Sequence, residues 1–301
     1  DSVIRRLNIY FREMFPLIPR FLLGAIVFGE IYFMVLLNYG IVHFNIGIQE
    51  FVGAYTVFAF YMYLRVADDF KDYETDKRLF PNRALPSGKV NKRDLIVACT
   101  LAQVIAFILN VLYMNNTAFF LFLYGYGFLM SQWFFQRHKI QPNLPLALVT
   151  HNPVQIIINL YIISFTCVKY KLYPFTYITF LVLWTLYFPS LIWEISRKIR
   201  APREETEYVT YSKLFGYEKA TRFVMILTLT DIITNIILVW NLNKISVVAF
   251  IGIVSWMTIK FLQYIKDPYQ YKIVEKVERY TYIQETLMLL TVAVYLMIGK
   301  I

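Results

Sequence analysis

The sequence predicts an all-α membrane protein in which nine helices cross the bilayer. Of its 301 residues, 58% are hydrophobic and only 17% are charged, whereas about a quarter of a soluble domain is charged. The apolar residues form long runs that can each span the ~30 Å hydrocarbon core of a bilayer. The basic residues gather between alternate runs, which is typical of cytoplasmic loops.

Nine segments are long and apolar enough to cross the membrane. They are residues 21–39, 42–64, 95–114, 117–135, 145–168, 174–195, 221–240, 245–265 and 281–298. Only Asn115 and Asn116 separate the third segment from the fourth, which predicts a tight helical hairpin. Solid apolar runs disfavour a membrane β-barrel, whose strands alternate over ~10 residues. No polar segment resembles a separate soluble domain, so we expect one domain over residues 1–301.

The charge distribution predicts the orientation. If the N-terminus lies in the cytoplasm and nine spans alternate, 26 of the 30 Lys and Arg residues fall on the cytoplasmic side. The net charge of +10 therefore reflects membrane topology and does not indicate nucleic-acid binding. Cys99 and Cys167 both lie in apolar runs, which argues against a disulfide framework or a zinc site. We expect a multi-pass protein of a bacterial plasma membrane, with its chemistry on the cytoplasmic side.

An acidic cluster follows the second predicted span. It consists of Asp68, Asp69, Asp72 and Asp76. If the helix continues, Asp68, Asp72 and Asp76 lie on one face at i, i+4 and i+8. Like charges at this spacing repel, and the negative end of a helix dipole adds to the repulsion, so something positive should offset them. Carboxylates on one face suit Mg²⁺, which takes one or two of them and fills its shell with water and phosphate oxygens.

Cations surround this cluster. One interpretation is a solvated turn in which Lys71, Lys77 and Arg78 neutralise the aspartates. However, the Pro- and Gly-containing segment 81–89 predicts a turn that brings its cations, Arg83 and Lys89, back towards them. Carboxylates for a metal beside cations for phosphate together predict a diphosphate site.

These motifs resemble those of the UbiA superfamily of intramembrane prenyltransferases. The family's first motif reads N-D-x-x-D-x-x-x-D and is followed by R-P-L-P-S-G. Here Asp68 replaces the Asn, the three following aspartates keep their spacing, and residues 83–88 read R-A-L-P-S-G. Nine spans with a cytoplasmic N-terminus are also that family's architecture, so the resemblance covers essentially the whole chain.

The resemblance implies transfer of a polyprenyl group from its diphosphate to an acceptor, with Mg²⁺ as cofactor. The acceptor, whether lipophilic or aromatic, is not legible in the sequence. The implied catalytic residues are Asp72, Asp76 and Arg83. The implied metal ligands are Asp68, Asp69, Asp72, Asp76 and Glu194. The implied substrate-binding residues are Lys71, Lys77, Arg78, Arg197, Lys198 and Asn152.

A second acidic motif of the family is largely missing. Family members carry D-x-x-D-x-x-x-D after the sixth span, whereas here only Glu194 keeps an acid near that place and Arg197 stands at the next position. Arg197 and Lys198 would contact the diphosphate in place of a second Mg²⁺, although the positive-inside rule alone also accounts for them. Glu204 and Glu205 would replace the missing acids only if the loop folds back.

Several polar residues lie inside predicted spans. Glu30 and Asp231 are near mid-span, where ionisable groups are costly and are functional hypotheses. Pro153 predicts a kink that widens a cavity. Next to it, Asn152 or His151 would position an acceptor, although a lone His is more often structural.

Three other functions are compatible with parts of this pattern. The same fold could transfer a phosphosugar such as phosphoribose to a polyprenyl phosphate, or it could cyclise a terpene diphosphate. A transporter that uses Glu30 and Asp231 as an ion relay is a third alternative. No inverted repeat is visible, and a transporter has little need of four clustered aspartates in a cytoplasmic loop.

Overall fold

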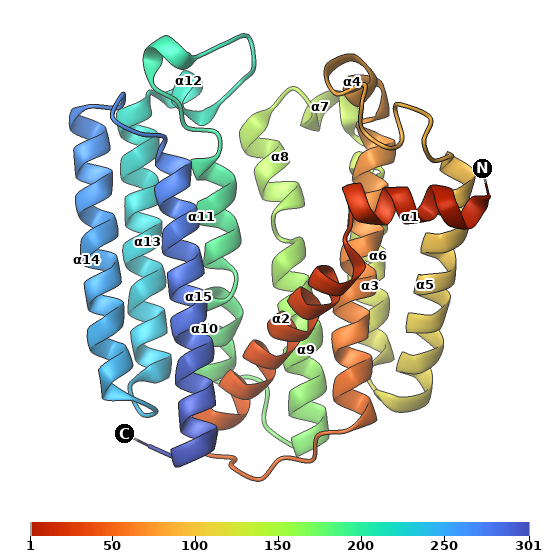
Figure 1. The fold of residues 1–301 in the computed structure, drawn as a ribbon. Helices are drawn as coiled ribbons and strands as arrows, with labels where there is room; N and C mark the ends of the chain where they lie inside the picture. Colours follow the sequence, from red (N-terminus) through yellow and green to blue (C-terminus); the bar gives the residue numbers. More distant parts are fainter. Residues whose placement is uncertain (1, 301) are drawn as a thin grey trace. The chain divides into compact units, whose positions relative to one another are not determined.

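The computed structural model describes residues 2–300, and within that range the chain forms helices and no β-strand (Figure 1). The predicted all-α class is confirmed. The N-terminal helices are α1 (Val3–Glu13), α2 (Leu17–Asn38), α3 (Ile48–Lys71), α4 (Tyr73–Leu79), α5 (Lys92–Tyr113), α6 (Thr117–Ser131), the 3₁₀ turn η1 (Trp133–Phe135) and α7 (Arg137–Ile140). The others are α8 (Leu144–His151), α9 (Val154–Tyr170), α10 (Tyr177–Thr185), α11 (Phe188–Ser196), the 3₁₀ turn η2 (Pro202–Glu204), α12 (Tyr211–Phe215), α13 (Tyr217–Val239), α14 (Lys244–Lys266) and α15 (Ile273–Ile298).

Between residues 2 and 300, seven helical segments are long and apolar enough to cross a membrane. They are α2, α5, α8 with α9, α10 with α11, α13, α14 and α15. Each coincides with a predicted span. The two further predicted spans also form helices: α3 carries charges at its C-terminal end, and α6 has only 15 residues. Nine crossings and a cytoplasmic N-terminus stay predictions.

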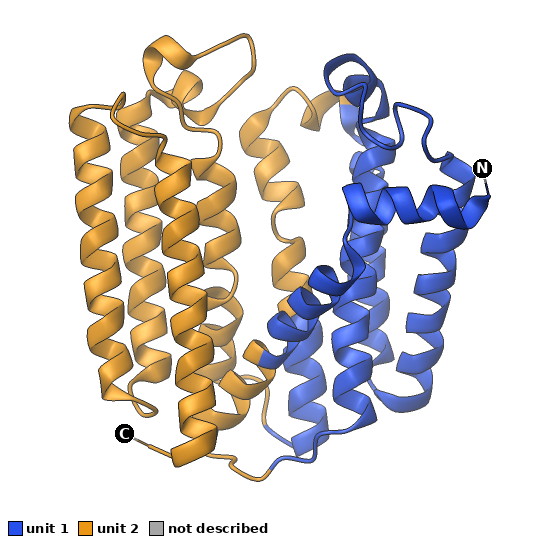
Figure 2. Ribbon diagram, in the orientation of Figure 1, with its two compact units in different colours: residues 1–29, 44–137, 160–172 blue, residues 30–43, 138–159, 173–301 orange. Residues whose placement is uncertain are grey.

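The chain divides into two compact units, coloured separately in Figure 2. Unit 1 comprises the chain up to Gly29 together with residues 44–137 and 160–172. It therefore contains α1, α3 to α6, and parts of α2 and α9. Unit 2 comprises residues 30–43, 138–159 and 173 onwards. Its helices are α8, α10 to α15, most of α7, and the remaining parts of α2 and α9.

In unit 1, α3 packs against α5 and α6, and α1 lies against α5. Arg6 of α1 donates two hydrogen bonds to the carboxylate of Asp94 in α5, from Nε at 2.6 Å and from Nη2 at 3.0 Å. Tyr10 of α1 is fully buried in the hydrophobic core with Phe58 of α3 and Leu95 of α5. The basic N-terminal segment before the first predicted span is thus a separate helix, bonded to the rest of unit 1.

The predicted hairpin between the third and fourth spans is confirmed. Asn115 has a φ of 44°, a left-handed conformation that Asn tolerates better than most residues. Asn116 then donates from Nδ2 to the Tyr161 carbonyl at 2.9 Å and accepts from Ser164 Oγ at 2.8 Å. Its amide therefore ties the hairpin to the C-terminal half of α9, inside unit 1.

In unit 2, α13 and α14 pack side by side, and α11 contacts both α13 and α15. The helix break predicted at Pro153 is confirmed, since α8 ends at His151 and α9 begins at Val154. A second break separates α10 from α11 at Leu186 and Tyr187, just before Pro189 in the first turn of α11. The predicted span 174–195 is thus formed by two consecutive helices, and the sequence analysis did not predict the break between them.

The backbones of α2 and α3 approach closely at Gly24, which gives a testable contrast. A Cβ atom at Gly24 would lie 2.9 Å from the Phe58 backbone nitrogen and 3.1 Å from the Ala54 carbonyl oxygen. Overpacking of this kind costs about 1–3 kcal/mol, so Gly24→Ala should lower the unfolding midpoint in detergent, followed by tryptophan fluorescence.

Gly29, one turn later in α2, is the matched control because a Cβ atom there meets nothing within 4 Å. Gly29→Ala should leave the protein as stable or raise its stability by up to about 1 kcal/mol, since Ala favours helix. Equal midpoints for the two variants would contradict the close helix approach.

Candidate functional site

The acidic cluster lies on a helix that continues through it. The backbone N–H of Asp72 donates to the Asp68 carbonyl at 2.9 Å, and that of Asp76 donates to Asp72 at 2.8 Å. The next bond of the series, from Phe80 to Asp76, is 2.7 Å. A distortion at Asp72, with φ −98° and ψ 9°, is what separates α3 from α4. The predicted i, i+4, i+8 hydrogen-bond register is present, but Asp68 and Asp72 are exposed whereas Asp76 is buried, so the three carboxyl groups do not share one environment.

Two of the four aspartates are buried and paired. Asp69 is 4% exposed; it accepts a hydrogen bond from the Tyr10 hydroxyl at 2.6 Å and forms an ion pair with Arg65. Asp76 is 6% exposed and pairs with Arg83, whose Nη1 lies 2.8 Å from Oδ1. Charge-assisted hydrogen bonds of this kind are stronger than neutral ones and hold both side chains in place. Of the two cations predicted to return to the cluster, Arg83 does so, whereas Lys89 pairs with Glu13 of α1 at 2.9 Å.

Asp68 and Asp72 differ from these two. Both side chains are exposed, and neither forms a hydrogen bond or an ion pair within the described part of the chain. Desolvation by the surrounding protein raises the pKa of the Asp68 carboxyl to about 6, although the side chain keeps access to solvent, and Lys71 opposes the shift. Desolvation also raises the pKa of Asp72. Both carboxylates would gain from a cation placed between them.

The fit of a metal ion depends on these two residues. Among residues 2–300, no group of three or more His, Cys, Asp or Glu side chains is arranged to hold a metal ion. A closed, all-protein cage is therefore not formed. Mg²⁺ requires no such cage, because it commonly uses one or two carboxylates with water and substrate phosphates. Asp68 and Asp72 fit that kind of site.

The neighbouring cations divide into two groups. Lys77 and Arg78 are exposed on α4. Lys71 instead lies 4.1 Å from the centroid of the Trp133 ring and donates to the Met130 carbonyl at 3.4 Å. It is also close enough to Asp68 and Asp72 to interact with them electrostatically. Lys71 therefore stands between the open carboxylates and the end of α6.

Sequence reasoning missed the residues that hold Asp69. Arg65 precedes Asp69 by four residues, a spacing at which an ion pair on a helix is expected. The sequence could therefore have predicted this pair. Tyr10 is 59 residues away in the chain. No local pattern identifies such a partner, because the contact exists only once α1 packs against α3.

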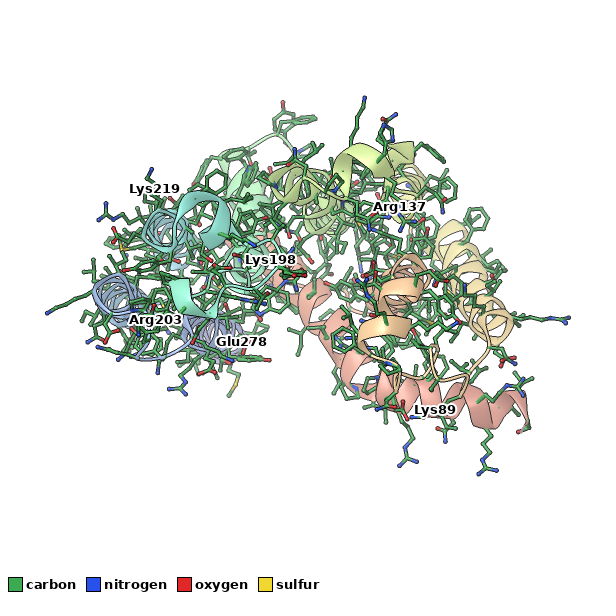
Figure 3. All side chains as sticks on the ribbon, turned by 90° about the horizontal axis from the view of Figure 1, so that it is seen from above. Lys89, Arg137, Lys198, Arg203, Lys219 and Glu278 are labelled. Atoms are coloured by element: carbon green, nitrogen blue, oxygen red, sulfur yellow. The ribbon has the colours of Figure 1, made fainter. Side chains whose placement is uncertain are left out.

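A cavity of about 870 Å³ lies inside unit 1, between α3, α5 and α6. Its walls are mostly apolar and aromatic, and Lys71 and Arg137 are its charged lining residues. Lys71 thus contributes both to this cavity and to the acidic cluster. Arg137 is labelled in Figure 3.

In unit 2 the predicted metal ligand Glu194 is already paired. Arg197 donates to its two carboxylate oxygens, from Nε at 2.7 Å and from Nη2 at 2.8 Å. Lys198, labelled in Figure 3, lies 3.2 Å from the same carboxylate. Arg197 and Lys198, predicted to contact phosphate, are therefore engaged with Glu194 at the end of α11. For either prediction to hold, these ion pairs must open.

The loop after α11 closes on itself. Glu205 accepts hydrogen bonds from the Thr210 hydroxyl at 2.7 and 2.9 Å and from the Ser212 hydroxyl. The Tyr211 N–H donates to the Lys198 carbonyl at 2.9 Å. The carboxylate of Glu205 thus stabilises the loop, while Glu204 is exposed in η2.

Asn152 connects the two helix breaks of unit 2. Its Nδ2 donates to the Tyr187 hydroxyl at 2.8 Å, so the break between α8 and α9 is bonded to the break between α10 and α11. His151 Nδ1 lies 2.9 Å from the Thr150 hydroxyl of the same helix. The predicted kink exists, and Asn152 presents its amide at it.

The intramembrane acids are buried in unit 2. Asp231 is fully buried; it accepts from Asn235 Nδ2 at 2.9 Å and from the Tyr280 hydroxyl at 3.4 Å. The Tyr280 bond ties α13 to α15, as expected for a structural role, while the Asn235 bond lies within α13. Glu30 is 6% exposed, and its Oε1 finds no hydrogen-bond partner in the described part of the chain.

Comparison with known proteins identifies the fold. No family model matches the sequence, and no curated protein matches it. A solved structure of a digeranylgeranylglyceryl phosphate synthase is similar, with a TM-score of 0.61 over 97% of this chain and 98% of that chain. The two sequences are 13% identical. The chain therefore shares the fold of that digeranylgeranylglyceryl phosphate synthase.

The pairing of Asp69 predicts a loss of stability when Arg65 is neutralised. Arg65→Gln leaves the buried carboxylate with the Tyr10 hydroxyl alone, which should cost about 1–3 kcal/mol. Arg78→Gln is the control, because an exposed substitution on α4 should stay within about 0.5 kcal/mol. The measurement is the unfolding midpoint of each variant in detergent; a shift in the control as large as in Arg65→Gln would refute the assignment.

The difference between open and paired aspartates predicts which of them bind metal. With pyrophosphate present, Mn²⁺ affinity measured by electron paramagnetic resonance should fall more than ~10-fold in Asp68→Asn and in Asp72→Asn, since even outer-shell changes cost 10- to 100-fold. Glu74→Gln, at an exposed acid of α4, should leave the affinity unchanged. Full Mn²⁺ affinity in a protein lacking both Asp68 and Asp72 carboxylates would remove the metal site from this helix.

Proposed function

We propose that this chain is a prenyltransferase that uses Mg²⁺ to move a polyprenyl group from its diphosphate to an acceptor in the membrane. The observation that carries the proposal is the pair of open carboxylates, Asp68 and Asp72, one helical turn apart at the end of α3. They stand beside two aspartates that are already paired, so they are the ones available to a cation. The fold shared with a digeranylgeranylglyceryl phosphate synthase supports the same chemistry.

In this proposal Asp68 and Asp72 bind the cation that accompanies the donor diphosphate. When bound, Mg²⁺ would act as a Lewis acid that stabilises the leaving diphosphate. Asp69 and Asp76, held by Arg65 and Arg83, keep the helix end and the following turn in place. We retain Asp69 and Asp76 as metal ligands only for a state in which those ion pairs open.

The cations around the cluster would stabilise the leaving group. Lys71 lies beside the open carboxylates, while Lys77 and Arg78 are exposed on the next helix and can move towards a phosphate. As the C1–O bond of the donor breaks, its electron pair goes to the diphosphate, whose new charge these residues offset. The acceptor then forms a bond to the allylic carbon and loses a proton. Arg83 would add a further positive charge near the leaving diphosphate while it stays paired with Asp76.

Unit 2 supplies a further set of proposed contacts. Glu194 as a metal ligand, and Arg197 and Lys198 as phosphate contacts, would act after a diphosphate displaces the carboxylate from its two cations. This exchange is chemically reasonable, because phosphate and carboxylate compete for the same guanidinium geometry. Asn152 would position the acceptor through its amide.

A second candidate function is transfer of a phosphosugar, such as phosphoribose, to a polyprenyl phosphate. The observation that favours it is the basic segment around Glu194, where two cations neutralise the single acid. Such a segment suits phosphate binding without a second metal ion. Cyclisation of a terpene diphosphate would need the same acidic cluster and no acceptor.

The central prediction concerns Asp72. Asp72→Asn should lower the rate of pyrophosphate release from radiolabelled geranylgeranyl diphosphate at least ~100-fold, the scale of losing one electrostatic contact to the leaving group. The protein should stay folded, because the Asp72 side chain is exposed. Glu74→Gln is the matched control and should keep full activity. Undiminished release in Asp72→Asn would contradict the proposed site.

A donor panel separates the proposed function from its alternatives. Wild-type protein with Mg²⁺ should release pyrophosphate from farnesyl or geranylgeranyl diphosphate when an acceptor is present. Turnover of phosphoribosyl diphosphate with a polyprenyl phosphate, alongside inactivity towards every prenyl diphosphate, would select the second function. A hydrocarbon product without acceptor would identify a cyclase.

A further inference from the structure

The cavity of unit 1 has the size of a ligand site and walls suited to a hydrocarbon chain. Its volume of about 870 Å³ lies in the upper part of the range of ~300–1,000 Å³ found for ligand pockets. The apolar and aromatic lining residues include Tyr63, Phe70, Val104, Phe107, Tyr124 and Phe128. These residues come from α3, α5 and α6, so the cavity is formed within one compact unit.

The cavity is open along the surfaces of α5 and α6. Ile96, Val104 and Phe107 of α5 are 51%, 48% and 44% exposed, and Phe128 of α6 is 52% exposed, although all four line the cavity. Both helices are apolar, and α5 is long enough to cross the membrane. In a bilayer these exposed side chains meet hydrocarbon, so the natural occupant of the cavity is a lipid chain that enters from the side.

Charge marks one end of the cavity. Lys71 and Arg137 are its charged lining residues, and Ser131 and Gln132 add polar groups at the same end of α6. Lys71 and Arg137 are close enough to repel each other electrostatically. Asp68 and Asp72 attract Lys71 from the adjoining face of α3. Two cations at the mouth of an apolar cavity are complementary to an amphiphile with an anionic head.

The backbone at this end is strained. Trp133, Phe134 and Phe135 have φ values of 54°, 50° and 58°, and three successive aromatic residues rarely adopt this left-handed conformation. Such strain persists where surrounding contacts impose it, and it clusters at ligand clamps. Here the turn ends α6, places the Trp133 ring against Lys71 and carries the chain to Arg137. The strained turn therefore shapes the charged end of the cavity.

We propose that this cavity binds an anionic phospholipid of the surrounding bilayer, with one acyl chain between α3, α5 and α6 and the phosphate against Lys71 and Arg137. Basic pockets between membrane helices recognise anionic head groups in this way, and an indole ring is well suited to the head-group level. A lipid phosphate at Lys71 would also change the charge that this residue offers to Asp68 and Asp72. The binding itself does not depend on the proposed prenyl transfer.

The test is lipid binding by the full chain, measured by native mass spectrometry in detergent without donor or Mg²⁺. Dioleoyl-phosphatidylglycerol should bind at least about fivefold more tightly than dioleoyl-phosphatidylcholine, because each cation near an anionic head group contributes on this scale. Arg137→Gln should lower the affinity for phosphatidylglycerol about fivefold, and Arg137→Lys should retain most of that affinity. Val104→Trp, which fills the cavity, should weaken binding of both lipids.

Two controls separate this site from general surface effects. Lys139→Gln removes a cation two residues along the chain that does not line the cavity, and Ile226→Trp enlarges an exposed apolar side chain on α13. Both should leave phosphatidylglycerol binding unchanged. Equal affinity of wild-type protein for the two lipids would overturn the proposal. So would a loss of phosphatidylglycerol affinity in Lys139→Gln as large as that in Arg137→Gln. One-for-one displacement of phosphatidylglycerol by geranylgeranyl diphosphate would also overturn it, because the cavity would then belong to the donor.

Discussion

The burial of two paired carboxyl groups, Asp69 and Asp76, constrains the structure of unit 1 around them. A buried carboxylate is costly unless it is paired and hydrogen-bonded, so each of these residues requires a partner in a fixed place. Asp69 obtains its partners from Tyr10 and Arg65, and Asp76 obtains Arg83. The first set fixes α1 against α3, and the second returns the 81–89 turn to α4. Of the four aspartates, Asp69 and Asp76 are thus structural, whereas Asp68 and Asp72 are left exposed and open to a ligand.

This division explains how an acidic cluster at a helix end can be stable and reactive together. If all four aspartates were open, their mutual repulsion and the helix dipole would destabilise the end of α3. Pairing two of them leaves Asp68 in the last turn of α3 and Asp72 at its C-cap, four residues apart, where they can share a cation. In unit 2 the corresponding acid, Glu194, is fully compensated by Arg197 and Lys198. The acidic cluster of unit 1 therefore keeps open carboxylates, whereas the Glu194 segment of unit 2 carries more cations than acids.

Much of the fold could be predicted because a bilayer leaves few options for the backbone. Every N–H and C=O group in hydrocarbon must be bonded within its own helix, so long apolar runs predicted the helices directly. Pro153 predicted one break correctly, while the break before Pro189 was missed because hydropathy alone does not change there. The end of α6 was placed too late, at residue 135, since the apolar run continues through a left-handed turn of Trp and Phe.

The sequence by itself determined the helices, the register of the aspartates and the return of Arg83, because these follow from periodicity and from short-range turns. Only the tertiary structure decided which aspartates are paired. Tyr10 reaches Asp69 across 59 residues, and burial depends on what packs around each side chain. The acidic cluster is therefore predictable as a group, whereas the separate tasks of Asp68 and Asp72 on one side and Asp69 and Asp76 on the other arise from packing.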